Sequence, residues 1–193
     1  QVTDMDSDHP VYSYARCLTC GGVVSGYADG TFRPNAPVTR GQLSKMVANA
    51  AGYDGAVSGQ TFPDVASDSP FYLYVERLAQ RGIIGGYADG TFRPNYSVTR
   101  GQLAKIVSGA IGETGNPGQQ RFEDVTPDSP FYTWVQHLTG KAIMSGYPCG
   151  SVPGEPCGEG NLPYFRPGNN ATRGQTAKIV AGAFFPNCDS FTR

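Results

Sequence analysis

The chain has 193 residues, a formal net charge of −1, 16% charged residues and 39% hydrophobic residues. A chain of this length can bury a core of its own. The near-zero charge without a basic stripe argues against nucleic-acid binding, and the lack of any run of 18 apolar residues argues against a membrane span.

The first 57 residues hold the first of three copies of one pattern. Its core is the block Gly26 to Pro34, which reads Gly-Tyr-Ala-Asp-Gly-Thr-Phe-Arg-Pro and contains the strong turn signal Asp29-Gly30. The start of this copy has diverged from the pattern, with Val2 where the later copies have Phe. The opening Gln1-Val2-Thr3 is compatible with a processed mature terminus.

The second copy spans residues 58–117, and its block at 86–94 repeats the first letter for letter at an offset of 60. We expect a first helix from Ser69, with Pro70 just inside it, to Gly82. Phe71, Val75 and Leu78 fall on one apolar face of that helix.

A second helix is predicted at the end of every copy, and it starts with a capping box. Thr99 and Gln102 are spaced so that each side chain caps the other's backbone amide. The same device recurs in the other two copies as Thr39 with Gln42 and Thr172 with Gln175.

The third copy spans residues 118–193 and has a rebuilt loop. Its second helix lies 73 residues beyond that of copy two, and the extra 13 residues fall in the loop that contains Cys149 and Cys157. Phe165-Arg166-Pro167 restores the pattern, but the Asp-Gly turn is gone.

Five cysteines indicate an oxidising compartment. We interpret Cys149 and Cys157 as a disulfide that restricts the inserted loop. A bond from Cys17 or Cys20 to Cys188 would join the first copy to the last. Of the two, we expect Cys20 to pair with Cys188. A zinc site or redox motif is disfavoured, because only two histidines exist and no βαβ context is present.

The predicted fold is mainly α: three helix-loop-helix repeats with short extended loop segments. One such repeat cannot bury both its helix faces, so neighbours share a core. Three copies can do this as an open row or as a closed pseudo-threefold bundle, and we select the bundle as one structural unit.

These motifs resemble the S-layer homology (SLH) family. The resemblance rests on Phe-x-Asp-Val, Gly-Tyr-x-Asp-Gly-Thr-Phe-x-Pro and Thr-Arg-x-x, and covers nearly the whole chain. It implies a bundle with the first helices packed centrally, on the bacterial cell surface. It also implies grooves between motifs that bind a secondary cell-wall polysaccharide, often through a pyruvate ketal. The family's key arginine corresponds to Arg40, Arg100 and Arg173. Gly-Gln replaces its usual Ala-Glu.

An arginine in the first turn of a helix faces a partial positive charge. Free amides together with a guanidinium make an anion site, and arginine can hold a carboxylate with two parallel bonds. The structural alternative is a salt bridge to a nearby carboxylate such as Asp64 or Asp124.

Further ligand contacts are predicted from lysines five residues after each arginine and from the residues of the Gly-Tyr turn. The lysines do not share a helix face with the arginines. They could reach a neighbouring groove, and the alternative, a lysine in solvent without a ligand role, is at least as common. The tyrosines would stack on a sugar ring, although an aromatic residue beside a glycine turn more often covers the core and exposes only its hydroxyl. The set is Lys45, Lys105, Lys178, Tyr27, Tyr87, Tyr147, Gly26 and Gly86.

No enzymatic site, cofactor or metal is expected. Asp4, Asp64 and Asp124, each followed by a second Asp four residues later, are interpreted as loop and helix-entry hydrogen bonding rather than as calcium or glycosidase carboxylates. The first functional hypothesis is a non-catalytic anchor that binds cell-wall polysaccharide. The second is a self-assembling filament or surface-layer subunit, a homo-oligomer built from heterologous faces.

Overall fold

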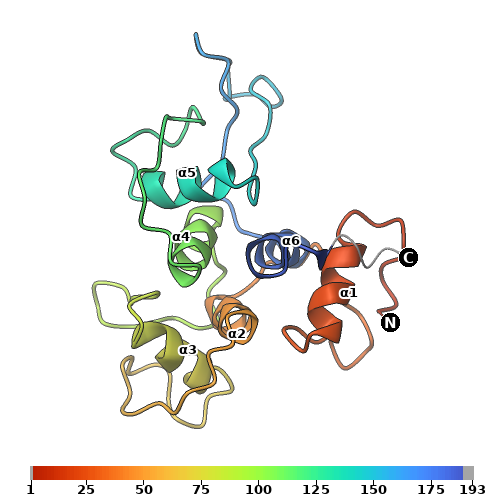
Figure 1. Ribbon diagram of the computed structural model, residues 1–193, viewed down its shortest axis with the longest axis vertical. Helices are drawn as coiled ribbons and strands as arrows, with labels where there is room; N and C mark the ends of the chain where they lie inside the picture. The colour runs from red at the N-terminus through yellow and green to blue at the C-terminus, as the bar shows by residue number, and fades with distance from the viewer. Residues whose placement is uncertain (1, 189–193) are drawn as a thin grey trace. The chain divides into compact units, whose positions relative to one another are not determined.

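The computed structural model describes residues 2–188, so Gln1, part of the predicted processed terminus, lies outside it. Each sequence repeat contributes two helices, and the described residues form no strand (Figure 1). In chain order the helices are α1 (Tyr12–Cys20), α2 (Arg40–Ala50), α3 (Tyr72–Ala79), α4 (Arg100–Ala110), α5 (Tyr132–Gly140) and α6 (Arg173–Phe184). The prediction of three helix-loop-helix repeats is confirmed.

The second helix of each repeat begins where the capping box predicts. Thr39, Thr99 and Thr172 are the N-caps, and both reciprocal bonds of the box are present in all three. The predicted start of the first helix at Ser69 is wrong. Ser69 and Pro70 form a turn, closed by the Tyr72 N–H donating to the Ser69 carbonyl at 3.0 Å, and α3 begins at Tyr72.

The chain divides into two compact units, residues 1–98 with 171–193 and residues 99–170. In the first unit α3 packs on α2 and α1 packs on α6, while α2 and α6 contact one another. In the second unit α5 packs on α4. Each such pair joins the second helix of one repeat to the first helix of another, because a single repeat cannot cover its own apolar faces.

The second helices are the more buried set. Seven residues of α2 are buried, against Ala15 and Leu18 alone in α1. The implication that the first helices pack centrally is therefore wrong within the first unit, where α2 and α6 form the inner contact. The reason lies in the residue pattern: the polar residues Gln42, Lys45 and Asn49 of α2, none of them buried, are three and four residues apart and form one narrow stripe, so that the rest of the helix surface can pack.

A closed ring of backbone hydrogen bonds joins the three repeats inside the first unit. Val38 N–H donates to the Ala171 carbonyl at 3.0 Å, Ala171 N–H to Val98 at 2.9 Å, and Val98 N–H to Val38 at 2.8 Å. An open row of repeats has no such ring. The pseudo-threefold closure predicted from the sequence is present at this point.

Both disulfides lie within single units. Cys149–Cys157 closes the inserted loop as predicted. The other bond joins Cys17, not Cys20, to Cys188, and Cys20 is a free, exposed thiol. The choice of Cys20 was wrong because, at 100° per residue, Cys20 lies almost opposite the buried face formed by Ala15 and Leu18. Cys17 lies nearer that face, which packs on α6.

Candidate functional site

Three arginines open the second helices, and all three are buried. The exposed fractions of Arg40, Arg100 and Arg173 are 5%, 5% and 6%. Each follows a capping threonine, so the helix start fixes the position of its Cα, and the side chain runs into the neighbouring repeat of its own unit.

One edge of each guanidinium is bound to backbone carbonyls. Arg173 Nε donates to the Phe32 carbonyl at 2.8 Å, and its Nη2 donates to the Ser25 carbonyl. The equivalent acceptors are Phe92 (2.7 Å) and Gly85 (3.0 Å) for Arg40, and Phe165 (2.8 Å) and Ser145 (2.8 Å) for Arg100. Within residues 2–188 the Nη1 group of each arginine has no hydrogen-bond partner, and it is not fully buried.

Aromatic rings complete the surroundings of each guanidinium. The carbon at the centre of the Arg173 guanidinium lies 5.1 Å from the Tyr27 ring centre and 4.6 Å from that of Phe32. The corresponding rings are Tyr87 (5.1 Å) and Phe92 (4.3 Å) for Arg40, and Tyr147 (5.1 Å) and Phe165 (4.6 Å) for Arg100. The structure thus brings each predicted arginine together with the predicted tyrosine.

The salt-bridge alternative is wrong for all three arginines. Within the described chain, no carboxylate oxygen lies within 4.0 Å of their guanidinium nitrogens. Asp64 instead accepts the backbone N–H groups of Phe92 and Arg93, each at 2.7 Å. Asp4 and Asp124 do the same for their own repeats, in agreement with loop hydrogen bonding rather than metal binding.

The expectation of free amides at these helix starts is wrong. In α2 the N–H groups of Arg40 and Gly41 donate to the carbonyls of Tyr96 and Pro94, and Gln42 N–H donates to the Thr39 hydroxyl. The same bonds recur in α4 and α6. The first-turn amides are therefore not available to an anion, which leaves the guanidinium as the candidate group.

Burial lowers the pKa of the Arg40, Arg100 and Arg173 guanidiniums, although an arginine keeps its charge at physiological pH. The five N–H donors of a guanidinium form a rigid fork. Because the Nε–Nη2 edge donates to carbonyls, only the Nη1–Nη2 edge can donate to an acceptor with two oxygens. Each site is a buried cation with one edge that no described residue binds.

A cleft of about 220 Å³ lies at Arg173 inside the first unit. Four of the predicted ligand residues line it: Gly26, Tyr27, Lys45 and Arg173. Lys45 comes from α2 and Arg173 from α6, so the lysine reaches a groove of another repeat's arginine, as its helix spacing indicates. Gln42, Met46 and Phe71 also line the cleft and were not predicted.

Two of the three predicted lysines lie over aromatic rings of the first helices. Lys45 Nζ lies 5.5 Å from the Tyr74 ring centre, and Lys178 Nζ lies 5.9 Å from that of Tyr14. Lys105 is exposed on α4. Such contacts reduce the freedom of a long side chain without neutralising its charge.

The glycines of the Gly-Tyr turn have a steric role. A Cβ on Gly86 would lie 2.8 Å from the Thr91 carbonyl oxygen and 2.9 Å from the Phe62 ring, and one on Gly26 would lie 3.0 Å from the Thr31 carbonyl oxygen. They allow the close approach in which Tyr27 N–H donates to Thr31 and Tyr87 N–H donates to Thr91, each at 2.8 Å.

The Gly-Gln pair that departs from the family pattern also has a structural explanation. A Cβ on Gly41 would lie 2.6 Å from the Phe71 ring, and one on Gly101 would lie 2.6 Å from the Phe131 ring. Glutamine preserves the cap, since the Gln42 carbonyl oxygen accepts the Thr39 N–H at 3.1 Å.

Residues 2–188 contain no cluster of three or more His, Cys, Asp or Glu side chains that would hold a metal ion. Among the helices described, none has the length and apolar character needed to cross a bilayer.

These features define a class of protein: an α-helical repeat protein whose copies each bury an arginine that binds backbone carbonyls and aromatic rings of a neighbouring copy. The S-layer homology domain family matches residues 3–44, 61–104 and 121–177, one match per repeat. The chain belongs to this family, and the surface location implied by the resemblance agrees with it.

Three relatives illustrate the family. An endoglucanase of Bacillus sp. (strain KSM-635) is 28% identical over 174 residues, 88% of this chain and 17% of the relative. The surface-layer 125 kDa protein of Lysinibacillus sphaericus is 29% identical over 134 residues (69% and 11%). The cellulosome-anchoring protein of Acetivibrio thermocellus is 27% identical over 135 residues (65% and 30%). The chain thus spans less than a third of each of these relatives.

Proposed function

We propose that the chain is a non-catalytic module that binds an acidic polysaccharide of the bacterial cell wall and thereby holds a protein on the envelope. The polysaccharide we expect is pyruvylated, and the pyruvyl carboxylate is the group that the arginines bind. The observation that carries the proposal is the set of three buried guanidiniums without a carboxylate partner in the described chain.

A buried charge is normally paired, because desolvation disfavours it. Carbonyl bonds and aromatic faces offset part of that cost at Arg40, Arg100 and Arg173, but they leave the net charge in place. An anion at the open Nη1–Nη2 edge neutralises it and adds two charge-assisted hydrogen bonds.

The cleft at Arg173 has the lining of a sugar site. Tyr27 offers a ring face, Lys45 a second cation and Gln42 a carboxamide, within a volume of about 220 Å³. A few polar groups converging beside an aromatic ring are typical of a site that fixes a ligand's orientation. Two cations and no acidic side chain line this cleft, which favours a negatively charged ligand.

The test is calorimetric titration with purified wall polysaccharide, before and after removal of its pyruvyl groups. Replacing the three arginines by lysine (R40K, R100K and R173K) keeps the charges but loses the planar fork, so we expect about tenfold weaker binding or more. Lys141→Gln is the matched control, because Lys141 pairs with Glu113, at 2.9 Å, and not with any of these arginines. Equal binding of the triple variant, or of the pyruvyl-free polymer, would overturn the proposal.

Self-assembly into a filament or surface layer stays a prediction. Electron microscopy of the purified protein tests it, and monodisperse monomer at every concentration and salt level would count against it. No contact within residues 2–188 favours assembly over polysaccharide binding.

A further inference from the structure

A second arginine lies on the same tyrosine in every repeat. The guanidinium carbons of Arg33, Arg93 and Arg166 lie 4.1, 4.2 and 4.0 Å from the ring centres of Tyr27, Tyr87 and Tyr147. These distances are shorter than the 5.1 Å between the same rings and the buried arginines. Each of these tyrosines therefore lies between or beside two cations, and its orientation depends on both.

These outer arginines have an uncommon backbone. Their φ angles are 57°, 59° and 59°, in the left-handed region that residues other than glycine seldom adopt. Such conformations persist only where the surrounding structure fixes them. Here the fixing group is an aspartate, since Asp124 accepts the N–H groups of Phe165 (2.7 Å) and Arg166 (2.6 Å). Asp4 and Asp64 bind the equivalent amides.

A carboxylate holds each outer guanidinium, and the third repeat obtains it from a different place. Asp29 and Asp89 pair with Arg33 (2.7 Å) and Arg93 (2.8 Å) across an exposed turn. The third repeat lacks that aspartate. Glu155, from the inserted loop, binds Arg166 with both oxygens, at 2.8 Å to Nε and 2.8 Å to Nη2.

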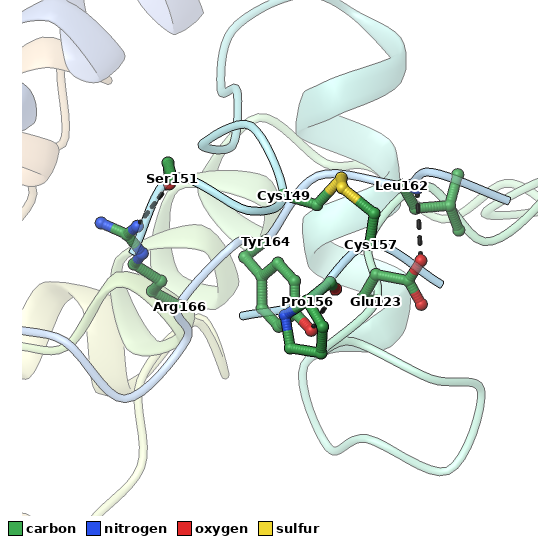
Figure 2. The surroundings of a disulfide bond; sticks show 8 residues. All are labelled: Glu123, Cys149, Ser151, Pro156, Cys157, Leu162, Tyr164 and Arg166. Atoms are coloured by element: carbon green, nitrogen blue, oxygen red, sulfur yellow. Dashed lines mark hydrogen bonds between the residues drawn. A yellow bond between two sulfur atoms is a disulfide. The ribbon is translucent and has the colours of Figure 1, made fainter. Parts of the chain in front are cut away.

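The inserted loop is built to present Glu155. Cys149–Cys157 closes it, and inside the ring Gly150 N–H donates to the Glu155 carbonyl at 2.6 Å. Figure 2 shows the disulfide with Arg166 reaching Ser151 and the Tyr164 hydroxyl bound to Pro156. Tyr164 in turn exchanges two backbone bonds of 2.8 Å with Tyr147. The loop is thus fastened to the backbone of the site's own tyrosine.

We propose that Glu155 is a positioning residue of the third binding site: it holds Arg166 on Tyr147, and Tyr147 in turn lies against the buried Arg100. The inference rests on the proposed function, because it assigns the work of Glu155 to polysaccharide binding. It also makes the insertion a replacement of the lost Asp-Gly turn that keeps the third site competent.

The Glu155–Arg166 pair differs from the other two in its shielding. Its side chains are 16% and 19% exposed, against 49% and 51% for Asp29 and Arg33. A bidentate, shielded pair is less weakened by salt than an exposed single contact. We therefore expect the position of Arg166 to depend less on salt than the positions of Arg33 and Arg93 do.

The experiment uses the full chain with R40K and R173K, so that Arg100 is the remaining buried arginine. Glu155→Gln is compared with Glu123→Gln, a matched control, because Glu123 also binds the inserted loop (Leu162 N–H, 3.3 Å) but does not touch Arg166. Binding of wall polysaccharide is measured at low and high salt. The resonances of the Arg166 Nε–H and the Tyr147 ring are measured without ligand.

We expect Glu155→Gln to weaken binding by about three- to tenfold, the loss of one cation–π arrangement, and to shift both resonances. Glu155→Asp retains the carboxylate and restores part of the affinity. Parent affinity in Glu155→Gln, or an equal loss in Glu123→Gln, would overturn the positioning role. If the parent binds no polysaccharide, the proposed function fails for this site. In that case unshifted Arg166 and Tyr147 resonances in Glu155→Gln overturn the inference, and shifted ones retain the positioning contact.

Discussion

The glycine after each buried arginine allows one aromatic side chain to reach the helix backbone. Phe71 packs against Gly41 and Phe131 against Gly101, whereas Gly174 faces Val11 and Pro34. Phe71 also lines the cleft at Arg173, so this contact joins helix packing to the shape of the candidate site.

We expect Gly41→Ala to destabilise the protein by about 1–2 kcal/mol. Overpacking costs about 1–3 kcal/mol, and alanine's better helix propensity offsets about 1 kcal/mol of that. Urea unfolding measures the difference. In a Phe71→Ala background the loss disappears, because the clash is with the ring. Gly85→Ala is the control, since its Cβ would meet no atom within 4 Å. An unchanged loss in the double variant would contradict the steric explanation.

Aspartates in the turns make the free energy of unfolding depend on pH in the acid range. The Thr31 hydroxyl and then Arg33 hold the pKa of the Asp29 carboxyl well below its usual range, and Thr91 and Arg93 do the same for Asp89. A depressed pKa contributes stability that is present above the unfolded value of about 3.9 and is lost as pH falls through the folded value.

The free energy of unfolding should therefore fall as pH drops below about 4, whereas at higher pH the contribution of these groups is fully present and changes little with pH. Urea titrations at a series of pH values measure it. The double variant D29N and D89N should show a shallower acid decline, because it has lost two of the responsible groups. An unchanged acid slope in that variant would assign the decline to other carboxylates, such as Asp4, whose pKa the amides of Phe32 and Arg33 lower against the opposing effect of burial.

At the scale of an element, the capping boxes are the part of the fold that short-range chemistry determines. The reciprocal bonds of Thr99 and Gln102 connect residues three apart. We expect Thr99→Ala to cost about 1 kcal/mol and Thr99→Ser much less, because serine keeps the accepting oxygen. Thermal unfolding tests both variants. Equal losses for alanine and serine would show that the hydroxyl is not the stabilising group.

The elements that the sequence predicts well are those whose hydrogen bonds stay local. All three second helices and the Cys149–Cys157 loop were predicted for this reason. The first helix of repeat two was placed three residues early, because a Ser-Pro pair suits a turn as well as a helix start. Which cysteine pairs with Cys188 depends on how α1 turns its faces toward α6, a contact between distant segments.

The candidate site was predicted in part. Repetition singled out the arginines and tyrosines, and the structure brings them together. Their carbonyl partners lie 45 to 148 residues away, so no local pattern indicates them. The outer arginines were missed, although their recurrence in every Phe-Arg-Pro was a visible signal.

At the scale of the whole molecule, the first and last repeats are joined covalently where the other repeats use hydrogen bonds. Arg77 of α3 donates to the carbonyl of Gly55, and His137 of α5 contacts that of Gly115 at 2.8 Å. Cys17 occupies the matching position of α1, at the offset of 60. Its partner Cys188 follows α6 as Gly115 follows α4, at the offset of 73. The disulfide therefore closes the cycle of repeats at the same register as the hydrogen bonds.

This closure should be the larger contribution of the two disulfides to stability. Cys17 and Cys188 are 171 residues apart, and Cys149 and Cys157 only 8. If chain entropy dominates, the long loop contributes about 5 kcal/mol and the short one about 2–3 kcal/mol. Urea unfolding of the C17S and C188S pair, compared with the C149S and C157S pair, measures the difference. All variants carry Cys20→Ser, so that the free thiol cannot exchange into the bond. Equal losses would contradict the chain-entropy explanation. They would show that the unfolded chain is already compact without the Cys17–Cys188 bond, so that the bond removes little further conformational freedom.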